Sequence, residues 1–139
     1  MINARQLAHV CIFTHDLAAT EAFYTGPIGL TKTFDFVKDG QKIGFYLSLG
    51  ARTFIEVFTN AEAPFAKTGQ VNHLCLEVES IEAAVSALRT AGIDVSAPKY
   101  GIDDTWQAWL KDPSGTPIEL FQYTAKSAQF IGGDRVADW

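Results

Sequence analysis

The chain has 139 residues, of which 47% are hydrophobic and 12% aromatic, and this is typical of one folded domain rather than of a disordered chain. Its 16 acidic and 11 basic residues give a formal charge of −5, which argues against nucleic acid or an anionic membrane surface as a partner. No apolar run reaches the roughly 20 residues of a membrane-spanning helix, and no secretory signal begins the chain, so we expect a cytoplasmic protein without membrane partners.

The first half of the chain predicts the order β-α-β-β-β. Short runs of β-branched and aromatic residues indicate strands, and alternation in the first of them places His9, Cys11 and Phe13 on one face. The helix begins after the capping side chains of 14–16, and Asp39-Gly40 forms a hairpin turn. The strands are expected at residues 7–13, 31–37, 42–49 and 53–59, and the helix at about 17–25.

The same order returns in the second half. Its strands are expected at residues 71–78, 93–97, 105–111 and 117–123, its helix at 81–91 and a polar loop at 100–104. Two copies of one pattern indicate two four-stranded sheets with helices on their outer faces, hence an α+β fold. The expected organisation is a single domain with module 1 at about 7–59, a linker at 60–70, module 2 at about 71–123 and an unassigned tail at 124–139.

Two histidines and two glutamates recur at equivalent places. Glu119 follows Glu56 by 63 residues and His73 follows His9 by 64, with each histidine on the first strand of its half and each glutamate on the last. Each side chain taken alone is more often a hydrogen-bonded structural residue than a ligand. Because a lone buried carboxylate is costly, their joint recurrence favours one divalent cation. Nitrogen and oxygen ligands without thiolate suit Zn, Ni, Co, Mn or Fe(II).

Six further residues carry predictions of their own. Cys11 and Cys75 are expected to be buried, reduced thiols. Trp106 and Trp109 either line a hydrophobic pocket or fill the core. The acidic pair at 103–104 indicates a solvated loop, with a loop that covers the site as the alternative.

These features resemble the vicinal oxygen chelate superfamily, which includes glyoxalase I, extradiol dioxygenases, methylmalonyl-CoA epimerase, and fosfomycin- and bleomycin-resistance proteins. The resemblance covers about residues 7–123. It implies a curled mixed sheet that forms a cup. The motifs that carry it are His9, Asp16-Leu17, Ala22-Phe23-Tyr24, Gly29-Leu30, Ile55-Glu56-Val57, Asn72-His73 and the run from Asp112 to Leu120.

The resemblance also implies roles for individual residues. His9, Glu56, His73 and Glu119 are similar to the metal ligands of glyoxalase I, with Glu119 as the first candidate for catalytic base and Glu56 as its partner. Asn60 falls where glyoxalase I has an asparagine that contacts glutathione. Phe13 stands where that enzyme has an arginine. Because a phenyl ring cannot bind a carboxylate as a guanidinium does, a more apolar substrate is expected.

We therefore expect a divalent-metal-dependent, glyoxalase-like lyase or isomerase that acts on a small molecule next to a carbonyl, through an enediolate. The resemblance also implies a homodimer. One alternative is an Fe(II)-dependent extradiol-type dioxygenase that uses His9, His73 and Glu119. Another is a non-catalytic protein of the bleomycin-resistance kind that binds a small molecule. The predicted substrate-binding residues are Phe13, Asn60, Trp106 and Trp109.

Overall fold

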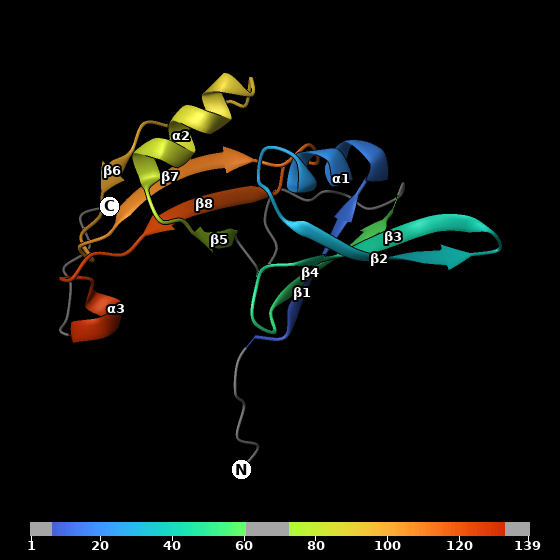
Figure 1. Ribbon diagram of the computed structural model, residues 1–139, viewed down its shortest axis with the longest axis horizontal. Helices are drawn as coiled ribbons and strands as arrows, with labels where there is room; N and C mark the ends of the chain where they lie inside the picture. The colour runs from blue at the N-terminus through green and yellow to red at the C-terminus, as the bar shows by residue number, and fades with distance from the viewer. Residues whose placement is uncertain (1–6, 61–72, 133–139) are drawn as a thin grey trace, which may run out of the picture. The chain divides into compact units, whose positions relative to one another are not determined.

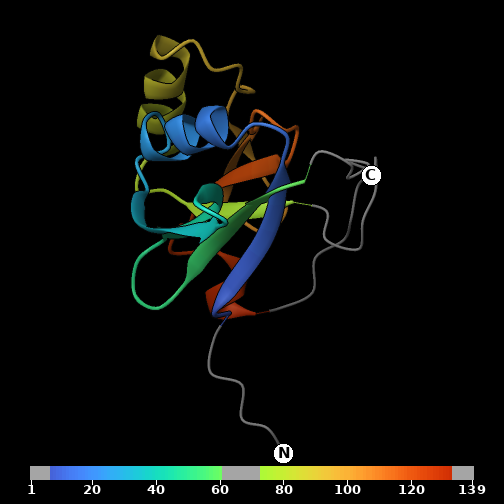
Figure 2. The same ribbon diagram turned by 90° about the vertical axis from the view of Figure 1, so that its right-hand side faces the viewer.

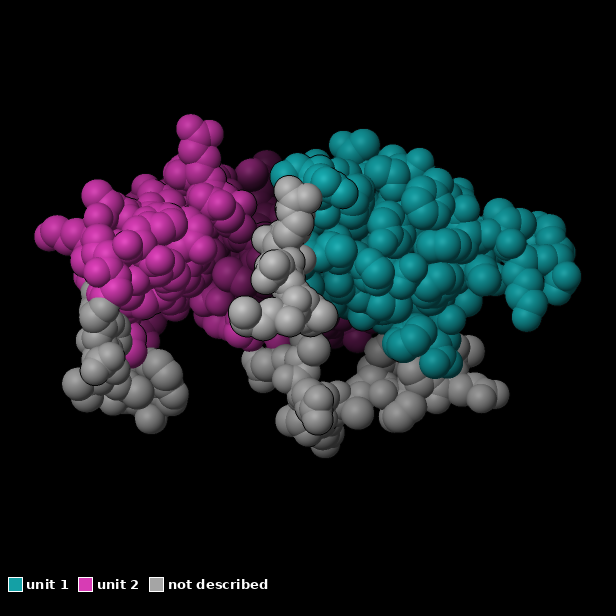
Figure 3. Space-filling view, turned by 90° about the horizontal axis from the view of Figure 1, so that it is seen from below, with its two compact units in different colours: residues 1–67 teal, residues 68–139 magenta. Residues whose placement is uncertain are grey.

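A computed structural model describes residues 7–60 and 73–132, which form two compact units, one within residues 1–67 and one within 68–139 (Figures 1 and 3). Each unit contains a helix and four strands in the predicted order, and unit 2 has a second, short helix after its last strand, so the α+β class and the repeat of β-α-β-β-β are confirmed. The predicted linker lies outside the described residues except for Asn60.

Unit 1 is a four-stranded mixed sheet with one helix. Its first and last strands are parallel neighbours and its other strand pairs are antiparallel, in the order β1-β4-β3-β2. Asp39 and Gly40 both have positive φ (51° and 75°), as the predicted hairpin turn requires. Its elements are β1 (His9–Thr14), α1 (Leu17–Thr25), β2 (Thr31–Lys38), β3 (Gln41–Ser48) and β4 (Phe54–Thr59).

Unit 2 repeats this arrangement in the order β5-β8-β7-β6, again with its first and last strands parallel. The Ser80 side chain caps its main helix, and the Gln122 side chain accepts a hydrogen bond from the Ile81 N–H at 2.7 Å, which fixes the helix to the sheet. Its elements are β5 (Leu74–Glu77), α2 (Ile81–Thr90), β6 (Lys99–Tyr100), β7 (Trp106–Lys111), β8 (Pro117–Gln122) and α3 (Ala128–Ile131).

The prediction of a strand at 93–97 was wrong. In this segment only Val95 forms an isolated bridge, to Leu110, and the edge strand is the two-residue β6, which begins after the predicted strand and overlaps the predicted loop at Tyr100. The Ser96 hydroxyl accepts a hydrogen bond from the Trp109 backbone N–H at 2.9 Å. A side-chain oxygen thus takes the place of the backbone carbonyl that a paired strand would supply. Pro98 has no N–H to donate and interrupts the pairing.

The helix-facing side of each sheet forms the core of its unit. In unit 1, α1 lies over one face of the sheet (Figure 2), and α2 covers the corresponding face in unit 2 (Figure 1). The opposite face of each sheet is therefore left for polar and aromatic side chains. The buried hydrophobic residues include Phe23, Tyr24, Phe45, Leu47, Ile55 and Val57 in unit 1, and Ile81, Val85, Leu88, Ala108, Leu110, Ile118 and Leu120 in unit 2.

Candidate functional site

The parallel pairing of β1 with β4 brings the predicted residues of unit 1 together. Cys11 is in register with Glu56, and the Nε2 atom of His9 lies 3.8 Å from the Oε2 atom of Glu56. The imidazole is 44% exposed and the carboxylate 20% exposed, on the sheet face away from α1. The Tyr46 ring lies edge-on to the imidazole, with centroids 5.8 Å apart. This half-site is open to solvent on the imidazole side.

Unit 2 places the equivalent pair closer together and in a less exposed setting. The Nε2 atom of His73 lies 3.2 Å from the Oε2 atom of Glu119, whose side chain is only 10% exposed. Trp109 on β7 is in register with Glu119 on β8. The Trp109 ring meets the His73 imidazole edge-on, with ring centroids 4.8 Å apart. The tryptophan therefore restricts the orientation of the imidazole.

The two cysteines were predicted to be buried, and this was wrong, because both are exposed free thiols on the His–Glu faces of their sheets. Partial burial of the sulfur raises the pKa of Cys11 to about 11, helped by a hydrogen bond to Glu56 and the charge of that residue. Partial burial and then the charge of Glu119 raise the pKa of Cys75 to about 12. Near neutral pH each thiol stays protonated and donates to its neighbouring carboxylate.

The predicted substrate-binding residues separate in the structure. Phe13 is 47% exposed on the same face of β1 as His9, and Trp109 lies beside His73. Trp106 projects from the opposite, helix-facing side of β7 and packs against Tyr100, with ring centroids 5.0 Å apart. Asn60 follows β4, where its N–H donates to the Thr14 carbonyl at 3.0 Å. Of the two tryptophans, only Trp109 is brought to a His–Glu face.

Sequence reasoning missed a set of aromatic residues on the same face as Glu56. Phe34, Phe36 and Tyr46 come from β2 and β3, and they join the Phe54 and Phe58 rings of β4. Phe34 and Phe36 are two residues apart on β2, and this spacing could have indicated that both rings lie on one face of the sheet. The irregular register between β2 and β3 hides which strand positions share a face.

The loop at 101–105 is tied to the segment after β8 rather than left free in solvent. The Asp103 carboxylate accepts hydrogen bonds from Thr105 and Gln129, both at 2.7 Å. Burial opposes ionisation of Asp103, but these hydrogen bonds outweigh it and lower the pKa of the carboxyl. The Asp103 carbonyl also accepts the Ala128 N–H at 2.9 Å, so the loop and α3 form one structure.

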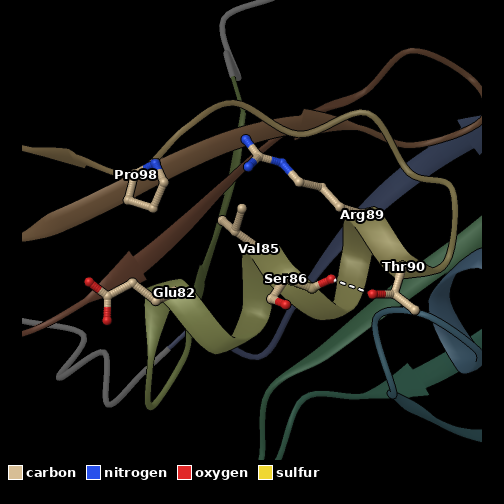
Figure 4. A pocket seen from close by; sticks show the side chains of 6 residues that line it. All are labelled: Glu82, Val85, Ser86, Arg89, Thr90 and Pro98. Atoms are coloured by element: carbon tan, nitrogen blue, oxygen red, sulfur yellow. Dashed lines mark hydrogen bonds between the residues drawn. The ribbon is translucent and has the colours of Figure 1, made fainter.

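A pocket of about 520 Å³ lies elsewhere in unit 2, beside α2 (Figure 4). The Arg89 guanidinium within it donates to the Val95 carbonyl at 3.2 Å and is therefore already engaged. Neither residue of the His73–Glu119 pair reaches this pocket, so we place the candidate site at the His–Glu pairs. The pocket is lined by Glu82, Val85, Ser86, Arg89, Thr90 and Pro98.

The donor chemistry of the half-sites fits a divalent cation. Two ligands about 2.1 Å from one cation lie about 3.0–3.4 Å apart at octahedral or tetrahedral angles. The His73–Glu119 separation of 3.2 Å falls in this range, whereas the His9–Glu56 separation of 3.8 Å is wider. Within residues 7–60 and 73–132, no group of three or more His, Cys, Asp or Glu side chains is arranged to hold a metal. A site shared by all four side chains stays a prediction.

Two duplicated sheet units, each with a His–Glu pair on the face opposite its helix, define the class of protein. Residues 6–120 match the family model of the Glyoxalase/Bleomycin resistance protein/Dioxygenase superfamily. The chain belongs to this superfamily. Its described residues include no helix with the length and apolar character needed to cross a membrane.

Similar proteins carry different names. "Uncharacterized protein YaeR" of Escherichia coli (strain K12) is 27% identical over 132 residues, which are 88% of this chain and 99% of that protein. The 2,2',3-trihydroxybiphenyl dioxygenase of Sphingomonas paucimobilis is 29% identical over 119 residues, which cover 82% of this chain but 40% of the dioxygenase. The crystal structure of lactoylglutathione lyase from Agrobacterium tumefaciens has a TM-score of 0.67 at 19% identity, over 89% of this chain and 96% of the lyase, and supports the fold alone.

Proposed function

We propose that the chain is a divalent-metal-dependent enzyme of the glyoxalase type, which isomerises or eliminates next to a carbonyl of a small-molecule substrate through an enediolate. The observation that carries the proposal is the recurrence of one His–Glu pair in each unit, with the glutamate on the last strand and the histidine on β1 in unit 1 and directly before β5 in unit 2. Neither pair belongs to the apolar core, so the fold itself does not require them.

His9, Glu56, His73 and Glu119 are the proposed ligands. When bound, a divalent cation polarises a substrate carbonyl and stabilises negative charge on its oxygen. The identity of the cation, among Ni, Zn, Co, Mn and Fe, is left open by this nitrogen and oxygen donor set. The neutral thiols of Cys11 and Cys75 orient the two carboxylates by donating hydrogen bonds to them.

Glu119 is the proposed base. Its side chain is 10% exposed against 20% for Glu56, so fewer water molecules compete for its carboxylate oxygens. One of these oxygens accepts the proton from the carbon next to the substrate carbonyl and returns it to the neighbouring carbon. Glu56 is proposed as the second carboxylate, and Trp109 keeps the His73 imidazole in place.

Phe13 and Asn60 are proposed substrate contacts. The exposed phenyl ring of Phe13 offers apolar area and no charge, so it favours an apolar substituent over a carboxylate such as those of glutathione. We also propose a homodimer, which sedimentation would test.

A second candidate is Fe(II)-dependent ring cleavage with His9, His73 and Glu119 as the ligands. The 29% identity to a trihydroxybiphenyl dioxygenase favours this candidate. In that case Glu56 would not be a ligand, and Glu56→Gln would leave Fe(II) binding intact. Oxygen uptake with a catechol separates ring cleavage from the glyoxalase reaction.

The deciding experiment is metal analysis of the purified protein, followed by assays with hemithioacetals of methylglyoxal formed from several thiols. The Glu119→Gln variant should lose turnover by about 10²- to 10⁴-fold. Glu82→Gln is the matched control, because Glu82 is an exposed carboxylate of the same unit on α2, which covers the opposite face of the sheet. A metal-loaded protein that turns over no hemithioacetal would overturn the glyoxalase assignment.

A further inference from the structure

We propose that the outer face of α2 binds a second copy of this chain, with the two α2 helices antiparallel and Glu82 of each copy paired with Arg89 of the other. The inference rests on the proposed homodimer, since it names the surface through which the copies meet, and it does not depend on the proposed reaction. The outer face consists of the exposed helix residues and the proline of the adjoining groove: Glu82, Ala83, Ser86, Ala87, Arg89, Thr90 and Pro98.

The helix α2 has one side packed on its own sheet and one side turned to solvent. Glu82, Ser86 and Arg89 follow one another at spacings of four and three residues, so they share the outward side, and all three are exposed. Figure 4 shows the two charged side chains near opposite ends of the helix, with Ser86 between them. The buried side consists of Ile81, Val85 and Leu88, each at most 3% exposed.

The two charged side chains of α2 lack ionic partners in their own chain. Neither Glu82 nor Arg89 forms an ion pair with any residue that the structure describes. One N–H of the Arg89 guanidinium donates to the Val95 carbonyl at 3.2 Å, which fixes the direction of the side chain. A guanidinium has several further N–H groups, so it can still bind a carboxylate from outside.

The spacing of these two charges is self-complementary. Seven residues separate Glu82 from Arg89, which is close to two helical turns and about 10.5 Å along the helix axis. A two-fold axis beside Ser86 therefore sets each carboxylate opposite the guanidinium of the other copy and forms two identical ion pairs. The helix dipoles are then antiparallel, which is also favourable. Parallel helices would instead place like charges against each other.

The side chains between the two charges are small enough for close helix packing. Ala83, Ser86, Ala87 and Thr90 are all short, so two helix axes can approach to about 8 Å. The groove beside α2, with a volume of about 520 Å³, leaves room for the partner's Arg89. A helix of ten residues offers less than the roughly 800 Å² per partner of a standard interface, so we expect a dissociation constant of about 1–100 μM.

This interface lies away from the His–Glu pair of unit 2. Because α2 covers the opposite face of the sheet, the second copy adds no side chain to the face that carries His73 and Glu119. Turnover per chain should therefore be the same in the monomer and the dimer. Dimerisation and the proposed reaction can be measured independently.

The test is a charge exchange followed by sedimentation equilibrium of the full chain over a concentration series. Glu82→Arg and Arg89→Glu each place like charges opposite each other, and each should weaken dimerisation by at least about tenfold. The double variant, which exchanges the two charges, should restore the affinity to within about threefold. Lys38→Glu is the matched control, because it makes the same change in net charge as Arg89→Glu at an exposed position of unit 1, and it should have no effect.

A cross-link tests the antiparallel geometry directly. Ser86→Cys places a thiol beside the two-fold axis, where facing Cα atoms of closely packed helices lie within the range of a disulfide. With copper phenanthroline as the oxidant, this variant should form a covalent dimer on a non-reducing gel. The unmodified protein, which retains the exposed Cys11 and Cys75, is the control and should form none.

The outcomes separate this interface from the proposed homodimer. A dimer whose affinity is unchanged in both single charge variants overturns the interface and leaves the homodimer standing, whereas a monomer at every concentration overturns both. Charges of these signs also suit the two ends of a helix. If they served only the stability of α2, the double variant would be the least stable by circular dichroism and would not restore dimerisation, and the proposal would be wrong.

Discussion

The Nε2 atom of His73, the residue before β5, lies 3.2 Å from the Oε2 atom of Glu119 on β8. The corresponding pair in unit 1, His9 and Glu56, is separated by 3.8 Å and is more exposed. The duplicated halves therefore hold the same two residue types in different environments, and the two pairs should respond differently to mutation.

Removal of His73 should destabilise the protein more than removal of His9. His73→Ala leaves the buried Glu119 carboxylate without its imidazole partner, and we expect the free energy of unfolding to fall by about 1–3 kcal/mol. For His9→Ala we expect less than about 1 kcal/mol, because that pair is solvated. Urea denaturation of the metal-free proteins measures both values. Equal losses would show that burial does not distinguish the pairs.

Divalent-cation affinity should depend on both units. We expect His9→Ala and His73→Ala each to weaken Zn²⁺ binding by at least about tenfold in equilibrium dialysis. His15→Ala is a suitable control, because His15 lies between β1 and α1, outside both pairs. An affinity that falls in only one of the two variants would restrict the metal site to one half of the chain.

The thiols should react slowly with alkylating reagents. Because the pKa of Cys11 is raised to about 11 and that of Cys75 to about 12, little thiolate is present at pH 8. The iodoacetamide reaction followed by mass spectrometry should be on the order of a hundredfold slower than that of free cysteine. Glu56→Gln should accelerate alkylation of Cys11 by several-fold and leave Cys75 unchanged. Rapid alkylation of both at pH 8 would contradict the assignment.

Acid should weaken the attachment of α1 to its sheet. Hydrogen bonds from Lys32 and Lys42 lower the pKa of Glu21 below its ordinary value of 4.5. A lowered pKa in the folded state stabilises the protein above pH 4.5, and this contribution is lost as the pH falls through the lowered value. Glu21→Gln should therefore cost less than about 1 kcal/mol at pH 7 and nothing in strong acid. If the difference in free energy of unfolding between the unmodified protein and Glu21→Gln grew as the pH fell, the pKa of Glu21 would be raised on folding rather than lowered.

Gly44 should not tolerate a methyl group. In Gly44→Ala the new atom would collide with the Val57 carbonyl as well as the Phe58 ring, and we expect a loss of about 1–3 kcal/mol in the free energy of unfolding. Gln41→Ala, at an exposed position of the same strand, is the control and should change stability by less than about 0.5 kcal/mol. Thermal unfolding of both variants gives the comparison.

Much of each unit followed from local sequence signals. The helix at 17–25 and the Asp39-Gly40 turn were confirmed, because capping side chains and turn residues act over a few positions. The strand at 93–97 and the burial of the cysteines were wrong, since they depend on which edge pairs and which face is covered. The sequence also placed His9 and Glu56 on the first and last strands, whose pairing the structure confirms. Whether the two pairs share one cation stays a prediction.

The parallel pairing of β1 with β4 has a consequence for biosynthesis. The imidazole of His9 emerges from the ribosome long before the carboxylate of Glu56, and nothing holds the pair together until β4 has been added between β1 and β3. A nascent chain that ends before β4 carries a histidine with no acidic neighbour from that strand. Contacts of such long sequence separation form slowly, so each half-site is among the last features of its unit to be assembled.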